Sequence, residues 1–348
     1  MAEEEQRTDW MRRNLVGLPV FVREMLAGGL AGMVGKTSVA PLERVKILFQ
    51  TGRMPGTSVF HTLSLLLKKE GFLGLYKGNG ASVVRIIPYS ALHFHAYEIN
   101  RRFLVESPPL LSLLGTNSSA PSTLVDLFAG AGAGATAVMV TYPLDLVRTR
   151  LACMSEVREN HGLAKQWTWA ERLTIREVVA DVLKKEGVLG LYRGVGPTLL
   201  GILPYAGLKF YIYQTLKQRY RLSRGDPIES NPKRKSHLPI PVMLAFGGIA
   251  GLIGQTAVYP LDVVRRRMQV PSHSSGFLPV SKNTHHRAPP VETYRSTWDG
   301  LGKIARSGGF RSLFAGLSIN YMKVIPSTAI GFTVYDALKH YLQLEGNL

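Results

Sequence analysis

The 348-residue sequence is poor in cysteine and in long uncharged apolar runs. Its single cysteine, Cys153, excludes disulfide frameworks and cysteine-ligated zinc sites within one chain. Few stretches reach about eighteen apolar residues without a charge, which is the usual signal of a membrane-spanning helix. Since the mean hydropathy is only +0.05, hydropathy alone does not indicate a membrane protein.

Acidic residues are also scarce. The chain has 24 aspartates and glutamates against 42 lysines and arginines, a formal net charge of +18. Such an excess favours an anionic partner, which can be nucleic acid, a lipid surface or a substrate. The bases are spread through apolar, glycine-rich segments and form no stripe or known binding motif, so nucleic acid is not expected.

The N-terminus lacks the features of a cleaved targeting segment. Glu3, Glu4 and Glu5 are unlike the acid-poor composition of a transit peptide, and no apolar segment follows a basic start. We therefore expect residues 1–20 to form a solvated tail.

The sequence does contain one hexapeptide three times. It reads PLERVK at 41–46, PLDLVR at 143–148 and PLDVVR at 260–265. In each copy the acid and the base are three residues apart, so on a helix they share one face. Glycines stand thirteen and nine residues before each proline: Gly28 and Gly32, Gly130 and Gly134, Gly247 and Gly251. Three copies in one register indicate a triplicated unit.

The second half of each unit keeps the same register. A glycine lies ten residues before a proline, and a tyrosine lies nine residues after it: Gly78, Pro88 and Tyr97; Gly194, Pro204 and Tyr213; Gly316, Pro326 and Tyr335. These patterns predict an all-α membrane protein with three tandem helix–loop–helix repeats, over residues 21–106, 124–221 and 240–344. Six transmembrane helices would surround a pseudo-threefold axis, the first running from Phe21 to Gln50 with a kink at its proline.

These motifs resemble those of the mitochondrial carrier family. Its even helices carry an aromatic-acid-x-x-base run, which here reads YEINR at 97–101, YQTLK at 213–217 and YDALK at 335–339. The resemblance covers residues 21–344. It implies a multi-pass protein of the mitochondrial inner membrane that carries an anionic nucleotide-type substrate. It further implies that the protein is a monomer surrounded by inner-membrane lipids, of which cardiolipin is a candidate. Such a carrier is expected to need no cofactor, metal or nucleic acid.

The resemblance also implies two rings of paired charge. An unpaired charge at bilayer depth costs roughly 2.5–3.5 kcal/mol, so the acid of one repeat is expected to meet the base of the next. The matrix ring would pair Glu43 with Arg148, Asp145 with Arg265 and Asp262 with Lys46. The family's glutamine brace is present as Gln50 and Gln269, whereas the second repeat has Ala152 at that position. The cytoplasmic ring would pair Glu98 with Lys217 and Asp336 with Arg101, leaving Lys339 opposite the neutral Gln214.

The family's substrate contacts lie three residues before the even-helix prolines. Those positions hold Arg85, Gly201 beside Ile202, and Lys323. Two bases suit phosphates, and a small residue beside an aliphatic one leaves a flat slot for adenine. Lys36 adds a further positive charge. Lys209 and His93 lie eight residues, about two helical turns, after Gly201 and Arg85, so both are expected to face the cavity. Lys209 can alternatively snorkel to the interface, and His93 can be a packing residue.

Residues 36–48 resemble nucleotide-type carriers, and the run GILPYAGLKF at 201–210 resembles coenzyme A carriers. We predict transport of coenzyme A by alternating access, in exchange for an adenine nucleotide; the alternative is an adenine nucleotide carrier. An enzyme is disfavoured, because the G-x-G-x-G run at 130–134 follows no strand and His285–His286 lacks spaced metal partners. A membrane scaffold would not need bases in a cavity.

Overall fold

The computed structural model describes residues 19–54, 58–107, 123–154, 174–223, 239–270 and 294–342. Within these ranges the chain forms helices, turns and no strand, so the all-α prediction is confirmed. Residues 1–18 of the expected tail, most of the loops expected after each odd helix and His285–His286 lie outside the described residues.

The first repeat corrects one prediction. In place of a single kinked helix from Phe21 to Gln50, the chain forms α2 (Val20–Ser38) and α3 (Ala40–Gln50), separated at Val39. Pro41 lies in the first turn of α3, where its missing N–H is not needed and its ring would obstruct a continuing helix. The prolines of the other repeats stay inside single helices, α7 (Thr123–Cys153) and α10 (Ile240–Gln269).

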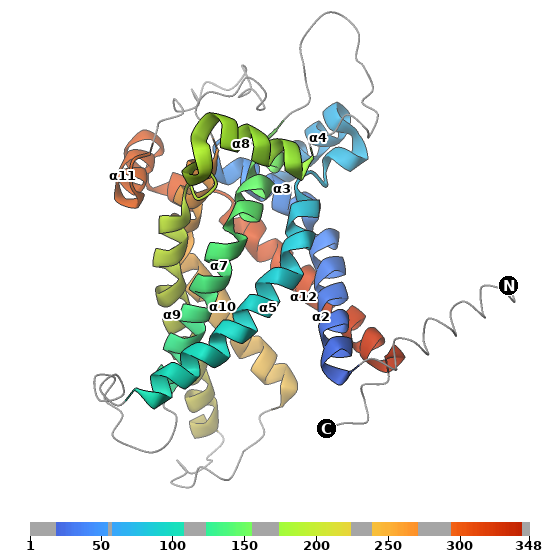
Figure 1. Ribbon diagram of the computed structural model, residues 1–348, viewed down its shortest axis with the longest axis vertical. Coiled ribbons are helices and arrows are strands. Elements are labelled where there is room, and N and C mark those ends of the chain that lie inside the picture. The colour runs from blue at the N-terminus through green and yellow to red at the C-terminus, as the bar shows by residue number, and fades with distance from the viewer. Residues whose placement is uncertain are drawn as a thin grey trace, which may run out of the picture.

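Each repeat continues with a short helix and a second long one. These are α4 (Val59–Gly74) and α5 (Asn79–Glu106), α8 (Ile175–Gly190) and α9 (Val195–Ser223), and α11 (Thr297–Gly308), the 3₁₀ turn η2 (Phe310–Phe314) and α12 (Leu317–Tyr341). The short helices gather with α3 at one end of the long helices (Figure 1). The order agrees with three tandem helix–loop–helix units.

A glycine before each even helix brings neighbouring repeats together. Gly78, Gly194 and Gly316 have positive φ values of 82°, 84° and 79°, a backbone region that glycine adopts readily. An added Cβ on Gly78 would lie 2.7 Å from the carbonyl oxygen of Arg148. The other two would meet the matching carbonyls of Arg265 and Lys46 at 3.0 and 3.3 Å. The glycines therefore let each repeat approach the signature base of the next.

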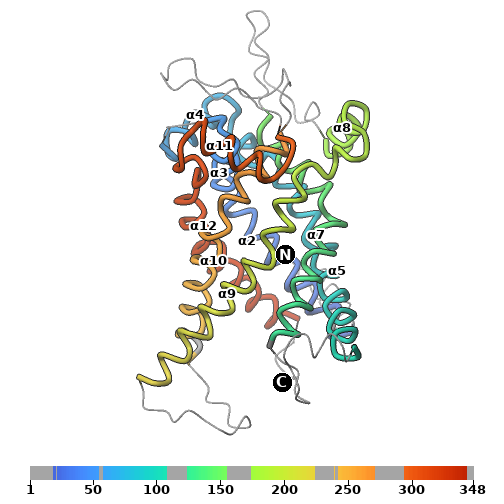
Figure 2. Tube along the Cα trace, turned by 90° about the vertical axis from the view of Figure 1, so that its left-hand side faces the viewer, coloured from blue at the N-terminus to red at the C-terminus, as the bar shows by residue number. Residues whose placement is uncertain are grey.

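The two ends of the helices differ in packing. Near the short helices, each repeat has a buried apolar cluster, built around Leu48, Leu146 and Val263. At the opposite end the long helices run in neighbouring pairs, α5 with α7, α9 with α10 and α12 with α2. The free ends of α9 and α10 diverge from those of α5 and α7 (Figure 2). The molecule is thus packed shut at one end and spread at the other.

Among the residues that the structure describes, two stretches are long and apolar enough to cross a membrane by length and composition, Leu124–Cys153 and Val242–Gln269. Large apolar side chains also lie exposed along the even helices, including Phe94, Phe103 and Ile325. Such exposure is costly in water but matches a lipid-facing surface.

Candidate functional site

Three ion pairs between different repeats join the odd helices at the packed end. The Lys46 Nζ lies 3.1 Å from the Asp262 Oδ2, and the Arg265 Nη2 lies 2.6 Å from the Asp145 Oδ2. Arg148 pairs with Glu43. All six side chains are between 2% and 17% exposed. These are the three pairs that the family resemblance predicts.

Glutamines brace two of the three pairs. The Gln50 Nε2 donates to the Asp262 Oδ2 at 2.9 Å, and the Gln269 Nε2 donates to the Asp145 Oδ2 at 2.9 Å. At the matching position of the second repeat, Ala152 provides only its carbonyl oxygen, which accepts from the Arg44 Nε at 3.1 Å. The pair of Glu43 with Arg148 therefore has no glutamine brace.

Asp145 has more partners than the sequence predicts. Besides Arg265, it binds the Arg266 Nη1 at 3.1 Å through Oδ2 and the Arg85 Nη1 at 2.9 Å through Oδ1. The Arg266 Nη1 also donates to the Gln269 Oε1 at 3.0 Å. Three guanidiniums on one buried carboxylate form strong, charge-assisted hydrogen bonds. Arg266 was not predicted from the sequence as part of this site. Its place in the run of three arginines at 265–267 was the available signal.

Two predicted substrate-contact bases bind ring acids in this structure. Arg85 reaches Asp145, as above, and its Nε also donates to the Thr141 Oγ1 at 3.1 Å. The Lys323 Nζ donates to the Glu43 Oε1 at 2.9 Å. The family's contact positions predict these two bases as substrate contacts, but they do not show that the side chains extend to the matrix ring.

Lys36 behaves differently. It is exposed, and within the described part of the chain it has no hydrogen-bond or ion-pair partner. It lies close enough to Arg85, Arg148 and Lys323 for these cations to repel it. A base held among other bases is a position for an anion.

The remaining predicted contacts lie along the even helices. An ideal Cβ on Gly201 would lie 3.7 Å from the Leu261 Cδ1, and one on Gly134 of α7 would lie 3.7 Å from the Ile202 Cγ2. The exposed Lys209 places its Nζ 5.9 Å from the ring centroid of Tyr205.

On α5, Arg85 and His93 both contact the ring of Tyr89. The Arg85 Cζ lies 5.1 Å from the ring centroid, and the His93 ring stacks on Tyr89 with centroids 5.9 Å apart. These three residues are spaced by four and form one column on the helix. The stacking favours the packing role for His93.

The six residues of the matrix ring, together with the four bases that bind them or lie close to them, carry an excess of four positive charges. The seven bases are Lys36, Lys46, Arg85, Arg148, Arg265, Arg266 and Lys323, and the three acids are Glu43, Asp145 and Asp262. Among the described residues, no group of three or more His, Cys, Asp or Glu side chains is arranged to hold a metal ion. The net positive charge of this group favours an anionic ligand.

The predicted cytoplasmic pairs are not formed in this structure. Across the described ranges no ion pair joins Glu98 to Lys217 or Asp336 to Arg101, and Gln214 is exposed and does not bind Lys339. The physical reason is that the helix pairs are separated at this end (Figure 2). The cytoplasmic ring stays a prediction for a state in which these ends converge.

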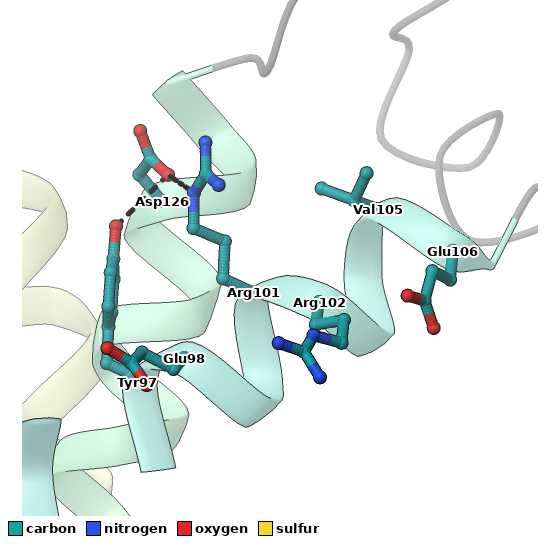
Figure 3. A pocket seen from close by; sticks show the side chains of 7 residues that line it. All are labelled: Tyr97, Glu98, Arg101, Arg102, Val105, Glu106 and Asp126. Atoms are coloured by element: carbon teal, nitrogen blue, oxygen red, sulfur yellow. Dashed lines mark hydrogen bonds and ion pairs between the residues drawn. The ribbon is translucent and has the colours of Figure 1, made fainter. Parts of the chain in front are cut away.

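Arg101 has a different partner. Its Nε lies 2.9 Å from the Oδ1 of Asp126, which also accepts the hydroxyl of Tyr97 at 3.1 Å. The three residues line a pocket of about 780 Å³ at the spread end, between α5 and α7 (Figure 3). Its other lining residues are Glu98, Arg102, Val105 and Glu106. None of the predicted substrate contacts lines this pocket.

Comparison with known proteins agrees with this arrangement. The family profile described as mitochondrial carrier protein matches residues 19–108, 119–224 and 236–346. Mitochondrial carrier protein CoAc1 of Arabidopsis thaliana is 47% identical over 335 residues, 94% of this chain and 92% of the relative. Human Solute carrier family 25 member 16 is 39% identical over 336 residues, 93% of this chain and 90% of that protein.

The human Mitochondrial coenzyme A transporter SLC25A42 is 38% identical over 321 residues, covering 92% of this chain and 87% of that protein. The triplicated profile, the inter-repeat ring of charge and these relatives agree with one another. The chain therefore belongs to the mitochondrial carrier family and is a multi-pass protein of the mitochondrial inner membrane.

Proposed function

We propose that this carrier transports coenzyme A, or a related adenosine 3′,5′-phosphate, across the inner membrane by alternating access, in exchange for an adenine nucleotide. The observation that carries the proposal is the excess of four positive charges in the matrix ring and the bases beside it. Coenzyme A has a phosphate monoester and a diphosphate, about four negative charges in all. The similarity to the human mitochondrial coenzyme A transporter SLC25A42 supports this choice among nucleotides.

In the proposed binding mode, Arg85 and Lys323 hold the 5′ phosphates and Lys36 adds a third cation. Gly201 and Ile202 bracket the adenine, where an absent side chain beside an aliphatic one leaves room for a flat ring. Lys209 lies two helical turns farther toward the spread end. It is exposed and free to meet the 3′-phosphate, which distinguishes coenzyme A from dephospho-coenzyme A.

Substrate binding would loosen the matrix ring through the same two bases. Arg85 now binds Asp145, and Lys323 now binds Glu43. Phosphates that compete for these bases would remove one partner from each acid. Because breaking a buried pair costs about 3–5 kcal/mol, the ring would open far more readily when a bound anion replaces the lost contacts. This coupling favours exchange over leakage and needs no chemical step in the substrate.

We further propose that the protein works as a monomer surrounded by inner-membrane lipids, cardiolipin among them. All three ring pairs form within one chain, so no second copy is needed to complete the matrix gate. The repeats of this monomer would span residues 21–106, 124–221 and 240–344. The net charge of +18 suits an anionic lipid surface as well as an anionic substrate.

The test is uptake of labelled coenzyme A by liposomes that contain the purified carrier and one internal nucleotide. The external panel is coenzyme A, dephospho-coenzyme A, adenosine 3′,5′-diphosphate, ADP and ATP. We expect uptake of coenzyme A against internal ADP, and little uptake into liposomes without a counter-substrate. Exchange of ADP with ATP and no uptake of coenzyme A would establish the alternative, an adenine nucleotide carrier.

A further inference from the structure

Asp126 holds two signature residues of α5 at the spread end. It lies in the first turn of α7, where the helix dipole favours an acid. Its Oδ1 accepts from the Arg101 Nε at 2.9 Å and from the Tyr97 hydroxyl at 3.1 Å (Figure 3). Tyr97 and Arg101 are four residues apart, so both reach α7 from one face of α5. One carboxylate thereby fastens α5 to α7.

Within the residues that the structure describes, the other two repeats have no such contact. Asp126 stands seventeen residues before its signature proline, and the matching positions hold Glu24 and Met243. Glu24 is exposed and, within the part of the chain that the structure describes, has no hydrogen-bond or ion-pair partner. Met243 is 43% exposed and has no charge. The fastening is therefore specific to the boundary between α5 and α7.

Arg101 is also the base that the cytoplasmic ring needs. Closing that ring would bring Arg101 to Asp336 of α12, but here Arg101 is turned to Asp126 of α7. The bond to Asp126 uses the Nε, and Tyr97 adds a second bond on the same oxygen. A guanidinium held in this way must leave Asp126 before it can pair across the mouth of the cavity.

We propose that Asp126 is an open-state latch, which stabilises the cytoplasm-open carrier by holding Tyr97 and Arg101 and competes with Asp336 for Arg101. The inference rests on alternating access, as proposed above, but not on the identity of the substrate. Arg101 is 40% exposed and Asp126 46% exposed, and exposed pairs of this kind are weak. A weak latch suits a gate that must release it in every transport cycle.

The experiment measures closure of the cytoplasmic end by cross-linking in the full-length chain. Cys153 is replaced by serine, and cysteines are placed by Glu98→Cys and Lys217→Cys, the other predicted pair of the cytoplasmic ring. A short bifunctional maleimide then joins them only when the end closes, so the cross-linking rate follows the closed population even when it is small. This reporter leaves Tyr97, Arg101 and Asp126 unchanged.

Asp126→Asn in the reporter chain should raise the cross-linking rate about two- to five-fold, the range expected for one exposed ion pair. Glu24→Gln is the matched control, because it removes the same charge at the same register position, and it should leave the rate unchanged. Arg101→Gln should abolish the response to Asp126→Asn. Asp126→Ser serves as a second variant, with size-exclusion profiles and helix content confirming that each protein is folded.

An unchanged or slower rate in Asp126→Asn would overturn the latch, as would an acceleration that persists in the Arg101→Gln chain. Nucleotide uptake by the reporter-free carrier is measured in parallel. A wild type that exchanges no nucleotide would refute the proposed function without touching the cross-linking comparison. Normal uptake with unaltered closure would refute the latch alone.

Discussion

The two ends of this carrier use the same kind of charge pair in different surroundings. At the packed end, the carboxylate of Asp145 is 2% exposed and binds three guanidiniums and a glutamine. At the spread end, the carboxylate of Asp126 is 46% exposed and binds one guanidinium and one tyrosine. Because water screens exposed charges, we expect the matrix ring to hold its end shut firmly, and the cytoplasmic contact only to bias an equilibrium.

The comparison predicts the largest effect at the matrix ring. Asp145→Arg should abolish transport, because it places a like charge against Arg85, Arg265 and Arg266 and removes a pair whose loss costs about 3–5 kcal/mol. Adding Arg265→Asp should recover part of the activity, and only part, because two guanidiniums stay without their carboxylate. Uptake by liposomes checks both variants. A double variant no more active than the single one would show that this pairing does not close the gate.

The next effect concerns substrate choice in the middle of the cavity. A charge-assisted hydrogen bond contributes about 1.5–3 kcal/mol, roughly one to two powers of ten in affinity. Lys209→Ala should weaken binding of coenzyme A by that amount and leave dephospho-coenzyme A nearly unchanged. Arg85→Ala should weaken both ligands. Competition against labelled coenzyme A measures the two affinities, and equal losses in Lys209→Ala would remove this residue from the recognition site.

These same residues show how much of the fold and of the candidate site could be predicted from the sequence. Triplication fixes the register of the signature residues, and the family resemblance then implies the pairs of Lys46 with Asp262 and of Arg148 with Glu43. Register does not give the reach of a long side chain, so the bonds of Arg85 to Asp145 and of Lys323 to Glu43 were not predicted. It also does not show where a proline ends a helix, as at Val39, and where it is accommodated within one.

Asp126 was missed for a related reason. An aspartate in the first turn of a helix is common, since it favours the helix dipole, and by itself it predicts nothing more. The available signal was the comparison of matching positions in the three repeats, which hold Glu24, Asp126 and Met243. The position breaks the threefold pattern, whereas the charge pairs of the predicted rings use residues that follow it.

A smaller effect is expected from the glutamine braces. Gln269 binds Asp145 and the hydroxyl of Tyr142, while Gln50 binds Asp262. Gln269→Ala should loosen the matrix ring and raise nucleotide leakage, measured as uptake without counter-substrate. Gln50→Ala should have the greater effect of the two, because Asp145 keeps three guanidiniums, whereas Lys46 is the one ion-pair partner left to Asp262 among the described residues. A larger leak in Gln269→Ala would contradict this ranking.

The smallest effect is expected at the cytoplasmic ring, where Gln214→Glu should complete the third pair by giving Lys339 a charged partner. Both positions lie at the spread end and Gln214 is exposed, so the closed population should rise by less than about five-fold. Impermeant maleimide labelling of Lys36→Cys in a Cys153→Ser chain measures this from the cytoplasmic side, and labelling should slow. Gln218→Glu, one turn farther along α9, adds the same charge away from the ring and should leave the rate unchanged. Equal rates for the two variants would show that a neutral Gln214 does not weaken the cytoplasmic ring. Burial alone would then account for the difference in strength between the charge pairs at the two ends.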